Sequence, residues 1–474
     1  MTGYYKGANG TAVQEAGGIW RWDPRPDVFP SMAAARAAVG GLPLATHAKY
    51  YTPRSYYEVH DGYKFMSNVT NGAALPLEAR FWDMLLQQAK GWGVALFEED
   101  WLASVFELML RPGQDTHTIA DFHRQLGDAA ERAGIPVQYC MPLVGDVLQS
   151  VERAAVRFVR VSDDYCTRVD QWRIGRASVI PHALGLFPFK DGWWSVERQP
   201  AFNATLNECW NGTGPFEEPN PALQAAVAVL SNGPVAVGDA AGRTNATLVR
   251  RTCLGNGTLT RPAHPALPIE ATFLGPGGPR AAPKGEVWHT HATIAGATAH
   301  YVLCANLSAA FSLTPADLGA APPDGAWRAW NTAAAVPAGG GPPPSLVAVD
   351  ASHPLPLPIG VEKHVGGVVP FSVFALSPVL SGGWVFLGEA GNKFMPISSQ
   401  RFAGLTANET EARVTVTLTA SSGQGDEVVD VRFLLLGAAE RQIAMGTATC
   451  SGSNRQRDVV CVHAPPSAVS CTCA

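Results

Sequence analysis

The sequence predicts an α/β domain of the (β/α)8 barrel type followed by an all-β domain. From about residue 40 to 265, short apolar runs alternate with amphipathic stretches, a pattern typical of repeated βα units around a parallel sheet. After Glu270 the helical period fades, proline and glycine become frequent, and short alternating runs indicate antiparallel strands. The 474 residues, 46% of them hydrophobic, are enough for two or three domains. We expect a barrel over residues 1–268 and an antiparallel β-sandwich over residues 269–474.

Six candidate strands of the barrel share a short apolar run. They are residues 42–51, 93–102, 135–143, 156–165, the region around 179–187, and residues 233–239. Helices are expected between them. Residues 76–92 place four apolar side chains on one face of a helix: Phe81, Met84, Leu85 and Leu86. Residues 118–134 repeat this pattern up to Gly134, which is a typical C-cap. Six strands with intervening helices make up most of a (β/α)8 barrel that lacks its first one or two strands.

The all-β domain is predicted from alternating runs at residues 300–307, 412–420 and 427–436. The longest uncharged segment, Val365 to Gly388, is nominally long enough to cross a bilayer. It contains Pro370, Pro378 and two Gly-Gly pairs, which predict two or three short strands with turns. We therefore expect no membrane anchor.

Charge and glycosylation signals bound the partners and the location. The net charge of −5 and the absence of a Lys/Arg-rich tract argue against nucleic acid or an anionic membrane as partner, so a neutral ligand fits better. Eight N-x-Ser/Thr sequons favour a secretory route, and they lie at Asn9, Asn68, Asn203, Asn211, Asn245, Asn256, Asn306 and Asn408. Four tail cysteines suit disulfides in an oxidising compartment, and they are Cys450, Cys461, Cys471 and Cys473. No signal peptide is visible, so the expected location is secreted or in the secretory lumen, with the cytoplasm as the alternative.

Polar residues follow the predicted strands at the ends where barrel enzymes place their sites. They are His47 and Lys49, Glu98 to Asp100, Asp163 and Asp164, Lys190 and Asp191, and Asp239. Two carboxyl groups, one ionised and one with a raised pKa, are the minimum equipment for retaining glycoside hydrolysis. Asp100 and the Asp163/Asp164 pair are the candidates. Five tryptophans suited to the apolar faces of sugar rings lie near these strands: Trp82, Trp92, Trp101, Trp193 and Trp194.

Each of these residues also has a structural interpretation. An Asp at a strand end can cap the next helix, and Lys190 with Asp191 can form an exposed ion pair. Along a strand, Glu98 shares the face of Asp100, which leaves Glu99 at the surface or between helices. The His-x-His spacing of residues 289–291 has no acidic or cysteine partner at the expected distance in sequence, so we predict no metal site.

Four segments resemble the strand 4, 6, 7 and 8 regions of the glycoside hydrolase clan that contains α-galactosidases and raffinose synthases. They are "GVALFEEDWL", "RFVRVSDDY", "GLFPFKDGWWS" and "LSNGPVAVGDAAG". The resemblance covers roughly residues 40 to 265 and implies Asp100 as nucleophile, with Asp164 as acid/base and Asp163 as the alternative. Glu98 replaces the clan's usual Lys. The implied substrate-binding residues are His47, Lys49, Glu98, Trp101, Arg160, Lys190, Asp191, Trp194 and Asp239. No cofactor is implied.

The expected function is therefore a retaining, α-galactosidase-like glycosidase that acts on an oligosaccharide or glycoconjugate. A transglycosylase of the raffinose-synthase type and a degenerate, non-catalytic sugar-binding relative are the alternatives. A metal-dependent barrel hydrolase using His47, Asp100 and Asp239 is a third, weaker option. Because "MTGYYKG" looks like the tail of the strand 2 loop, we expect this chain to be an N-terminally truncated member, whose competence is open.

Overall fold

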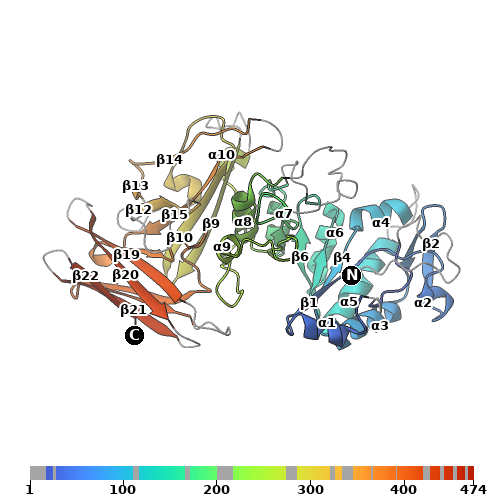
Figure 1. Ribbon diagram of the computed structural model, residues 1–474. Coiled ribbons are helices and arrows are strands. Elements are labelled where there is room, and N and C mark those ends of the chain that lie inside the picture. Colours follow the sequence, from blue (N-terminus) through green and yellow to red (C-terminus); the bar gives the residue numbers. More distant parts are fainter. Residues whose placement is uncertain are drawn as a thin grey trace. The chain divides into compact units, whose positions relative to one another are not determined.

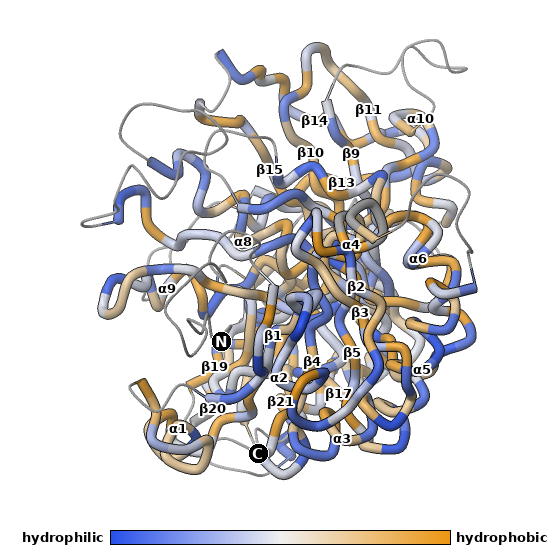
Figure 2. The backbone as a smooth tube through the Cα atoms, turned by 90° about the vertical axis from the view of Figure 1, so that its right-hand side faces the viewer, coloured by the Kyte–Doolittle hydropathy of each residue, from blue (hydrophilic) through white to orange (hydrophobic). Residues whose placement is uncertain are grey.

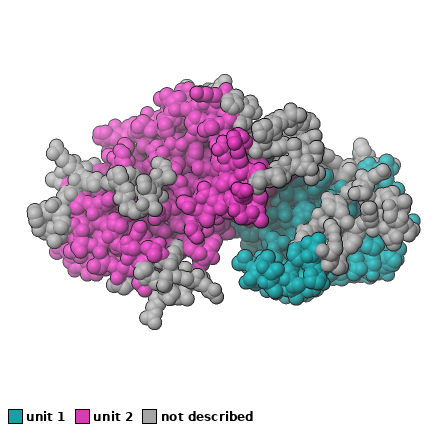
Figure 3. All heavy atoms as spheres, viewed as in Figure 1, with its two compact units in different colours: residues 1–161, 180–188 teal, residues 162–179, 189–474 magenta. Residues whose placement is uncertain are grey.

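The computed structural model describes the chain from residue 18 to residue 473 with internal gaps. The described ranges are 18–24, 28–109, 117–165, 171–199, 217–273, 285–320, 326–333, 345–363, 367–390, 392–419, 428–437, 442–451, 456–464 and 468–473. The chain forms two compact units, residues 1–161 with 180–188 and residues 162–179 with 189–474 (Figure 3). The predicted boundary after residue 268 separates types of secondary structure rather than compact units, and it stays a prediction.

A five-stranded sheet forms the centre of the first unit (Figure 1). Its order is β1 (Leu44–Ala48), β4 (Val94–Glu99), β5 (Val137–Tyr139), β6 (Val156–Arg160) and β7 (Phe187–Phe189). The pairs β1–β4, β4–β5 and β5–β6 run parallel. Parallel strands joined by helices are consistent with a TIM-like barrel. The strands predicted at residues 42–51, 93–102, 135–143 and 156–165 are confirmed.

Two of the predicted strands are corrected. Residues 179–187 contain helix α7 (Val179–Ala183), and only the last of them, Phe187, belongs to β7. Pro181 lies in the first turn of that helix, where its missing N–H costs no hydrogen bond. Residues 233–239 form no strand, and Val237 makes one isolated parallel bridge with Trp193. Pro234 cannot donate to a ladder, and the flanking glycines weaken extended pairing.

Helices α3 (Ala79–Gly91) and α5 (His117–Ala133) confirm the periodicity argument and lie side by side (Figure 1). Helix α3 buries Phe81, Leu85 and Leu86 against the core of the unit. Helix α5 ends before Gly134, whose φ of +71° gives the left-handed conformation expected of a C-cap glycine. The alternation of hydrophobic and hydrophilic residues along both helices can be followed in Figure 2. Each helix therefore presents an apolar face inward and a polar face to solvent.

Shorter elements complete the N-terminal α/β region. They are α1 (Met32–Ala38), α2 (Tyr56–Val59), α4 (Leu102–Met109), α6 (Val144–Gln149), the 3-10 helix η1 (Ser150–Glu152), and the hairpin of β2 (Phe65–Asn68) and β3 (Ala73–Pro76). The second unit adds three helices: α8 (Pro221–Leu230), α9 (Ala246–Arg250) and α10 (Glu270–Phe273). From Leu223 to Leu230, every residue of α8 is buried.

Antiparallel sheets follow in the second unit, as predicted. The largest has the order β13 (Val347–Val349), β12 (Trp327–Asn331), β15 (Phe371–Pro378), β10 (Ala297–Ala305), β9 (Glu286–Ile294) and β8 (Leu267–Pro268). Beside it lie the pair β11 (Phe311–Leu313) and β14 (Leu355–Leu357) and the 3-10 helix η2 (Pro315–Leu318). Strand β15, the 3-10 helix η3 (Ser381–Gly383) and strand β16 (Trp384–Gly388) confirm that the uncharged segment folds as strands and turns. Within the described ranges, no helix is long and apolar enough to cross a membrane.

Two further sheets carry the cysteine-rich tail. One has the order β16 (Trp384–Gly388), β19 (Val428–Leu436) and β20 (Gln442–Ser451). The other has the order β17 (Phe402–Asn408), β18 (Arg413–Leu418), β21 (Arg457–Ala464) and β22 (Ala468–Cys473). Disulfides join Cys450 to Cys473 between these sheets and Cys461 to Cys471 between neighbouring strands. The prediction that the tail cysteines pair is confirmed.

Candidate active site

The register of the parallel sheet gathers polar residues at the carboxyl ends of β1, β4 and β5. His47 lies opposite Glu98, and Glu99 lies opposite Tyr139. Asp100, the first residue after β4, donates its backbone N–H to the carbonyl of Ala48 over 2.9 Å. The strand end that the sequence singled out is therefore flanked by β1 and β5, as the site of a parallel α/β protein should be.

The carboxylate of Asp100 is held by donors on both sides. Nε2 of His47 lies 2.8 Å from Oδ2, and the N–H of Trp101 donates to Oδ1 over 2.6 Å. The thiol of Cys140, after β5, also hydrogen-bonds this carboxylate. Partial burial alone would raise the pKa of Asp100, but these hydrogen bonds together lower it below its usual value. Asp100 is thus an ionised carboxylate whose side chain keeps 14% exposure, as a nucleophile requires.

Glu99 corrects one expectation. It is 1% exposed, so the predicted position at the surface is wrong, because alternate residues of β4 face the core of the unit. The alternative position between helices stays a prediction. Burial, with the charges of Asp100 and Glu98 nearby, raises the pKa of Glu99 well above its usual value. Its Oε2 has no hydrogen-bond partner among the described residues. The charged form of Glu99 is therefore disfavoured in the folded protein, while Glu98 is half-buried on the other face.

Three other predicted residues belong to the first unit. Nζ of Lys49 lies 4.9 Å from the centre of the Trp101 ring, a cation–π contact. Trp101 has a φ of +63° and is 37% exposed, so its ring is available to a ligand. Arg160, the last residue of β6, is buried and close enough to Cys140 to lower the pKa of that thiol, which burial raises. Lys49 and Trp101 thus meet just after the ends of β1 and β4.

The other candidates belong to the second unit, where residues 162–165 and 190–195 are tied together. Oδ2 of Asp191 accepts the N–H of Tyr165 over 2.8 Å, and Oγ of Ser162 accepts the N–H of Asp191 over 2.9 Å. Asp163 is exposed and Asp164 is half-buried. Asp191 therefore anchors the loop that carries both candidate acids, because its carboxylate accepts a hydrogen bond from the backbone of that loop.

Lys190 is not part of an exposed ion pair. It is 1% exposed, and its ammonium group donates to the carbonyls of Asp191 and Gly192 over 2.8 and 3.3 Å. Burial lowers the pKa of Lys190 to about 7, against the raising effect of Asp191 and Glu218. Trp194 is also buried, at 4% exposure. The two residues support the loops from inside.

The carboxylate of Asp239 accepts three hydrogen bonds from its own chain. Its Oδ1 accepts from the N–H of Ser195 over 2.8 Å and from Nε2 of Gln199 over 2.7 Å. Its Oδ2 accepts from the hydroxyl of Ser195 over 2.5 Å. A carboxylate has about four acceptor positions, so little of Asp239 is left for a sugar hydroxyl. Its predicted contact with the substrate stays a prediction.

Several residues of these networks were not predicted from the sequence, and they include Cys140, Ser162, Tyr165, Ser195, Gln199 and Glu218. Cys140 directly follows strand β5, and Tyr165 directly follows the candidate acid Asp164. These positions were the signal that the sequence offered. Glu218 precedes Pro219 and the buried helix α8, in a stretch without strand character. Its hydroxyl partner, Tyr165, lies 53 residues away, so no local pattern marks that contact.

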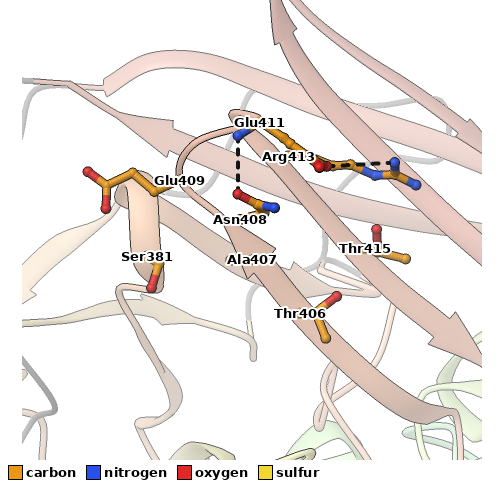
Figure 4. Close-up of a pocket in the computed structure, with 8 residues that line it drawn as sticks. All are labelled: Ser381, Thr406, Ala407, Asn408, Glu409, Glu411, Arg413 and Thr415. Atoms are coloured by element: carbon orange, nitrogen blue, oxygen red, sulfur yellow. Dashed lines mark hydrogen bonds and ion pairs between the residues drawn. The ribbon is translucent and has the colours of Figure 1, made fainter.

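A hollow of about 600 Å³ lies on the sheet of β17 and β18 and contains none of the predicted site residues (Figure 4). Its eight lining residues are Ser381, Thr406, Ala407, Asn408, Glu409, Glu411, Arg413 and Thr415. Glu411 pairs with Arg413, and Glu409 points away from both in Figure 4. None of the eight is aromatic, so the hollow lacks the usual platform for a sugar ring. In the described part of the chain, no group of His, Cys, Asp or Glu side chains has the arrangement of a metal site.

Comparison with proteins of known structure finds enzymes of similar fold. A variant of a GH27 β-L-arabinopyranosidase from Geobacillus stearothermophilus, in complex with arabinose, matches with a TM-score of 0.54 and 14% identity, over 77% of this chain and 83% of that chain. The wild-type form of that enzyme matches with a TM-score of 0.53 and 16% identity, over 77% and 82%. The similarity is one of fold. GH27 belongs to the clan that the four sequence segments resemble. No protein-family model matches the sequence, and no curated protein matches it by sequence.

Proposed function

We propose that this protein is a retaining glycoside hydrolase that acts on α-linked sugars of the galactoside type. A (β/α)8 barrel that lacks its first one or two strands, followed by a C-terminal β-sandwich, is part of this proposal. Asp100 would attack the anomeric carbon while the glycosidic C–O bond breaks, and Asp164, or alternatively Asp163, would protonate the leaving oxygen. The same acid, now a base, would then take a proton from water as the water attacks the glycosyl–Asp100 ester. No cofactor enters these steps.

The environment of Asp100 is the observation that carries the proposal. It is an accessible, ionised carboxylate at the end of a central parallel strand, oriented by His47 and by the N–H of Trp101. A nucleophilic carboxylate must be deprotonated and fixed in direction before the substrate arrives. Lys49 and the exposed ring of Trp101 support a sugar on the same side of the sheet end.

The choice of sugar rests on chemistry shared by two substrate classes. β-L-Arabinopyranosides and α-D-galactopyranosides have the same arrangement of ring hydroxyls and differ in the C5 hydroxymethyl group. The enzyme of similar fold is a β-L-arabinopyranosidase and has been observed with arabinose. We include both classes as candidate substrates. Because the two sugars differ in the C5 hydroxymethyl group, comparison of their rates of hydrolysis measures the effect of that group.

The experiment is an activity screen with 4-nitrophenyl α- and β-glycosides, which include α-D-galactopyranoside and β-L-arabinopyranoside. Wild type is compared with Asp100→Asn and with Asp121→Asn, a control at an exposed carboxylate of α5. The expected result is hydrolysis that falls on the order of 10³-fold or more in Asp100→Asn and is unchanged in the control. Proton NMR of the first-formed sugar should show retention of configuration, and intact mass should show a glycosyl adduct.

The alternatives give different results in the same screen. A transglycosylase would transfer the glycosyl group to an added sugar faster than to water. A degenerate relative would bind sugars without turnover. Loss of activity with a chelator would favour the metal-dependent hydrolase. Inversion of configuration would contradict Asp100 as nucleophile, because an inverting enzyme forms no covalent intermediate.

A further inference from the structure

Tyr165 is anchored at both its backbone and its side chain. It directly follows Asp164, and its N–H donates to Oδ2 of Asp191 over 2.8 Å. Its hydroxyl donates to Oε2 of Glu218 over 2.6 Å and accepts the N–H of Trp194 over 3.3 Å. Two separate tethers therefore fix the direction of the chain immediately after the candidate acid.

Glu218 is the buried end of the second tether. It is 1% exposed, and its Oε1 accepts the N–H of Asn220 over 2.7 Å. Its Oε2 also accepts from Nε2 of Gln224, over 3.1 Å. Burial raises the pKa of Glu218, against these hydrogen bonds and the charge of Lys190. A carboxylate this deeply buried, which accepts hydrogen bonds from Tyr165, Asn220 and Gln224, has little access to a substrate, so it must act through a neighbour.

We propose that Glu218 is a positioning residue for the acid/base of the reaction, which acts through the Tyr165 hydroxyl to hold Asp164 in the direction of the leaving oxygen. This inference rests on the proposed function. The positioning role also explains why a carboxylate lies in a site shielded from solvent, where burial without hydrogen-bond partners would cost free energy. Asp163, one residue farther from Tyr165 and exposed, is held less directly.

Misplacement of a general acid has a specific kinetic signature. Departure of a poor leaving group, such as phenol, needs proton donation, whereas 2,4-dinitrophenol leaves as a stable anion. Proton donation in the transition state contributes on the order of 10² to 10⁴-fold. Loss of the Glu218–Tyr165 tether should therefore slow phenyl glycosides much more than 2,4-dinitrophenyl glycosides. A purely structural defect would lower both rates together.

The test measures kcat/KM on the phenyl and 2,4-dinitrophenyl glycosides of whichever sugar wild type prefers. The variants are Glu218→Gln and Tyr165→Phe, and the control is Glu217→Gln, a neighbouring carboxylate that pairs with Arg198 and is 34% exposed. We expect the dinitrophenyl/phenyl ratio to rise at least about tenfold in both variants and to stay unchanged in the control. Far-UV circular dichroism and thermal unfolding establish that each variant is folded.

Each outcome separates the two claims. If wild type cleaves both glycosides and both variants lose the two rates in equal proportion, the positioning role is wrong and the proposed function stands. If wild type cleaves neither, both claims are overturned. If Glu218→Gln does not fold, Tyr165→Phe decides alone, because it removes one hydroxyl and leaves the carboxylate with two other donors.

Discussion

Nε2 of His47 lies 2.8 Å from Oδ2 of Asp100, across the neighbouring parallel strands β1 and β4. The two residues are 53 positions apart in the chain and meet because both follow the same edge of the sheet. His47 was predicted to bind substrate. Its contact with Asp100 gives it a second task, which is to orient the carboxylate and to favour the ionised form of the group.

Removal of that contact should change the acid side of the pH profile. His47 lowers the pKa of Asp100, so in His47→Ala this pKa should rise and the acid limb of kcat/KM should move to higher pH. His47→Gln keeps an N–H donor and should move the limb less. The profile of His60→Ala, a change at an exposed residue of the same unit, should match wild type. An unmoved acid limb in His47→Ala would contradict the assignment.

Glu99 should make the protein less stable as the pH rises. The pKa of Glu99 is raised in the folded state, so its contribution is present below the unfolded pKa of about 4.5 and is lost as the pH rises towards the folded value. Above pH 4.5 Glu99 loses its proton in the unfolded chain before it does so in the folded protein. The free energy of unfolding therefore falls by up to about 1.4 kcal/mol per pH unit. Urea unfolding at pH 5, 6.5 and 8 should show that the free energy of unfolding of Glu99→Gln rises relative to that of wild type as the pH increases. The control is Asp121→Asn, a change at an exposed carboxylate of α5, which should follow wild type.

A cluster of four histidines should make the antiparallel sheets sensitive to acid. Its members are His264, His289, His291 and His300. Nε2 of His289 lies 2.9 Å from Nδ1 of His300. Burial, with the neighbouring imidazoles, lowers the pKa of His289 to about 3 and that of His300 to about 4. Both lie below the unfolded value of about 6.5, so the stabilisation is complete above pH 6.5 and is lost as the pH falls towards 4 and 3.

Thermal unfolding between pH 7 and 4 tests the cluster. Wild type should lose melting temperature steadily below pH 6.5, and His300→Gln should flatten that loss because it removes one imidazole that must stay neutral. His353→Gln, at an exposed histidine paired with Asp350, should follow the wild-type slope. Parallel slopes for all three proteins would mean that other groups govern acid unfolding.

Two ion pairs of opposite burial should differ in their effect on stability. Arg401 donates to Glu389 over 3.0 Å with both side chains at 5% exposure or less, whereas the Arg132–Asp83 pair is about half exposed. Arg401→Ala leaves a buried carboxylate uncompensated and should cost about 3–5 kcal/mol of unfolding free energy. Arg132→Ala should cost less than about 1 kcal/mol. Chemical denaturation of the two variants measures the difference, and equal costs would show that the buried pair relaxes.

Local patterns in the sequence determined the elements and the position of the main candidate. Helices α3 and α5 follow from apolar residues at helical spacing, because a one-sided helix must bury that side. Strand β4 follows from an apolar run, and its terminal carboxylates marked Asp100. The wrong strand predictions at residues 179–187 and 233–239 have the same origin. Both stretches are apolar but contain proline, which cannot donate a backbone hydrogen bond to a sheet, and glycine, which weakens a strand.

Tertiary structure alone decided which of the marked residues act on each other. Whether Glu99 faces solvent or core depends on what packs against β4, and the sequence offered only that it opposes Glu98. The partners of Asp100, His47 and Cys140, come from two other strands, and the partner of Tyr165, Glu218, lies 53 residues away. Charge state and direction of a side chain are set by such distant contacts, because desolvation and hydrogen bonding act through space and leave no periodicity in the chain.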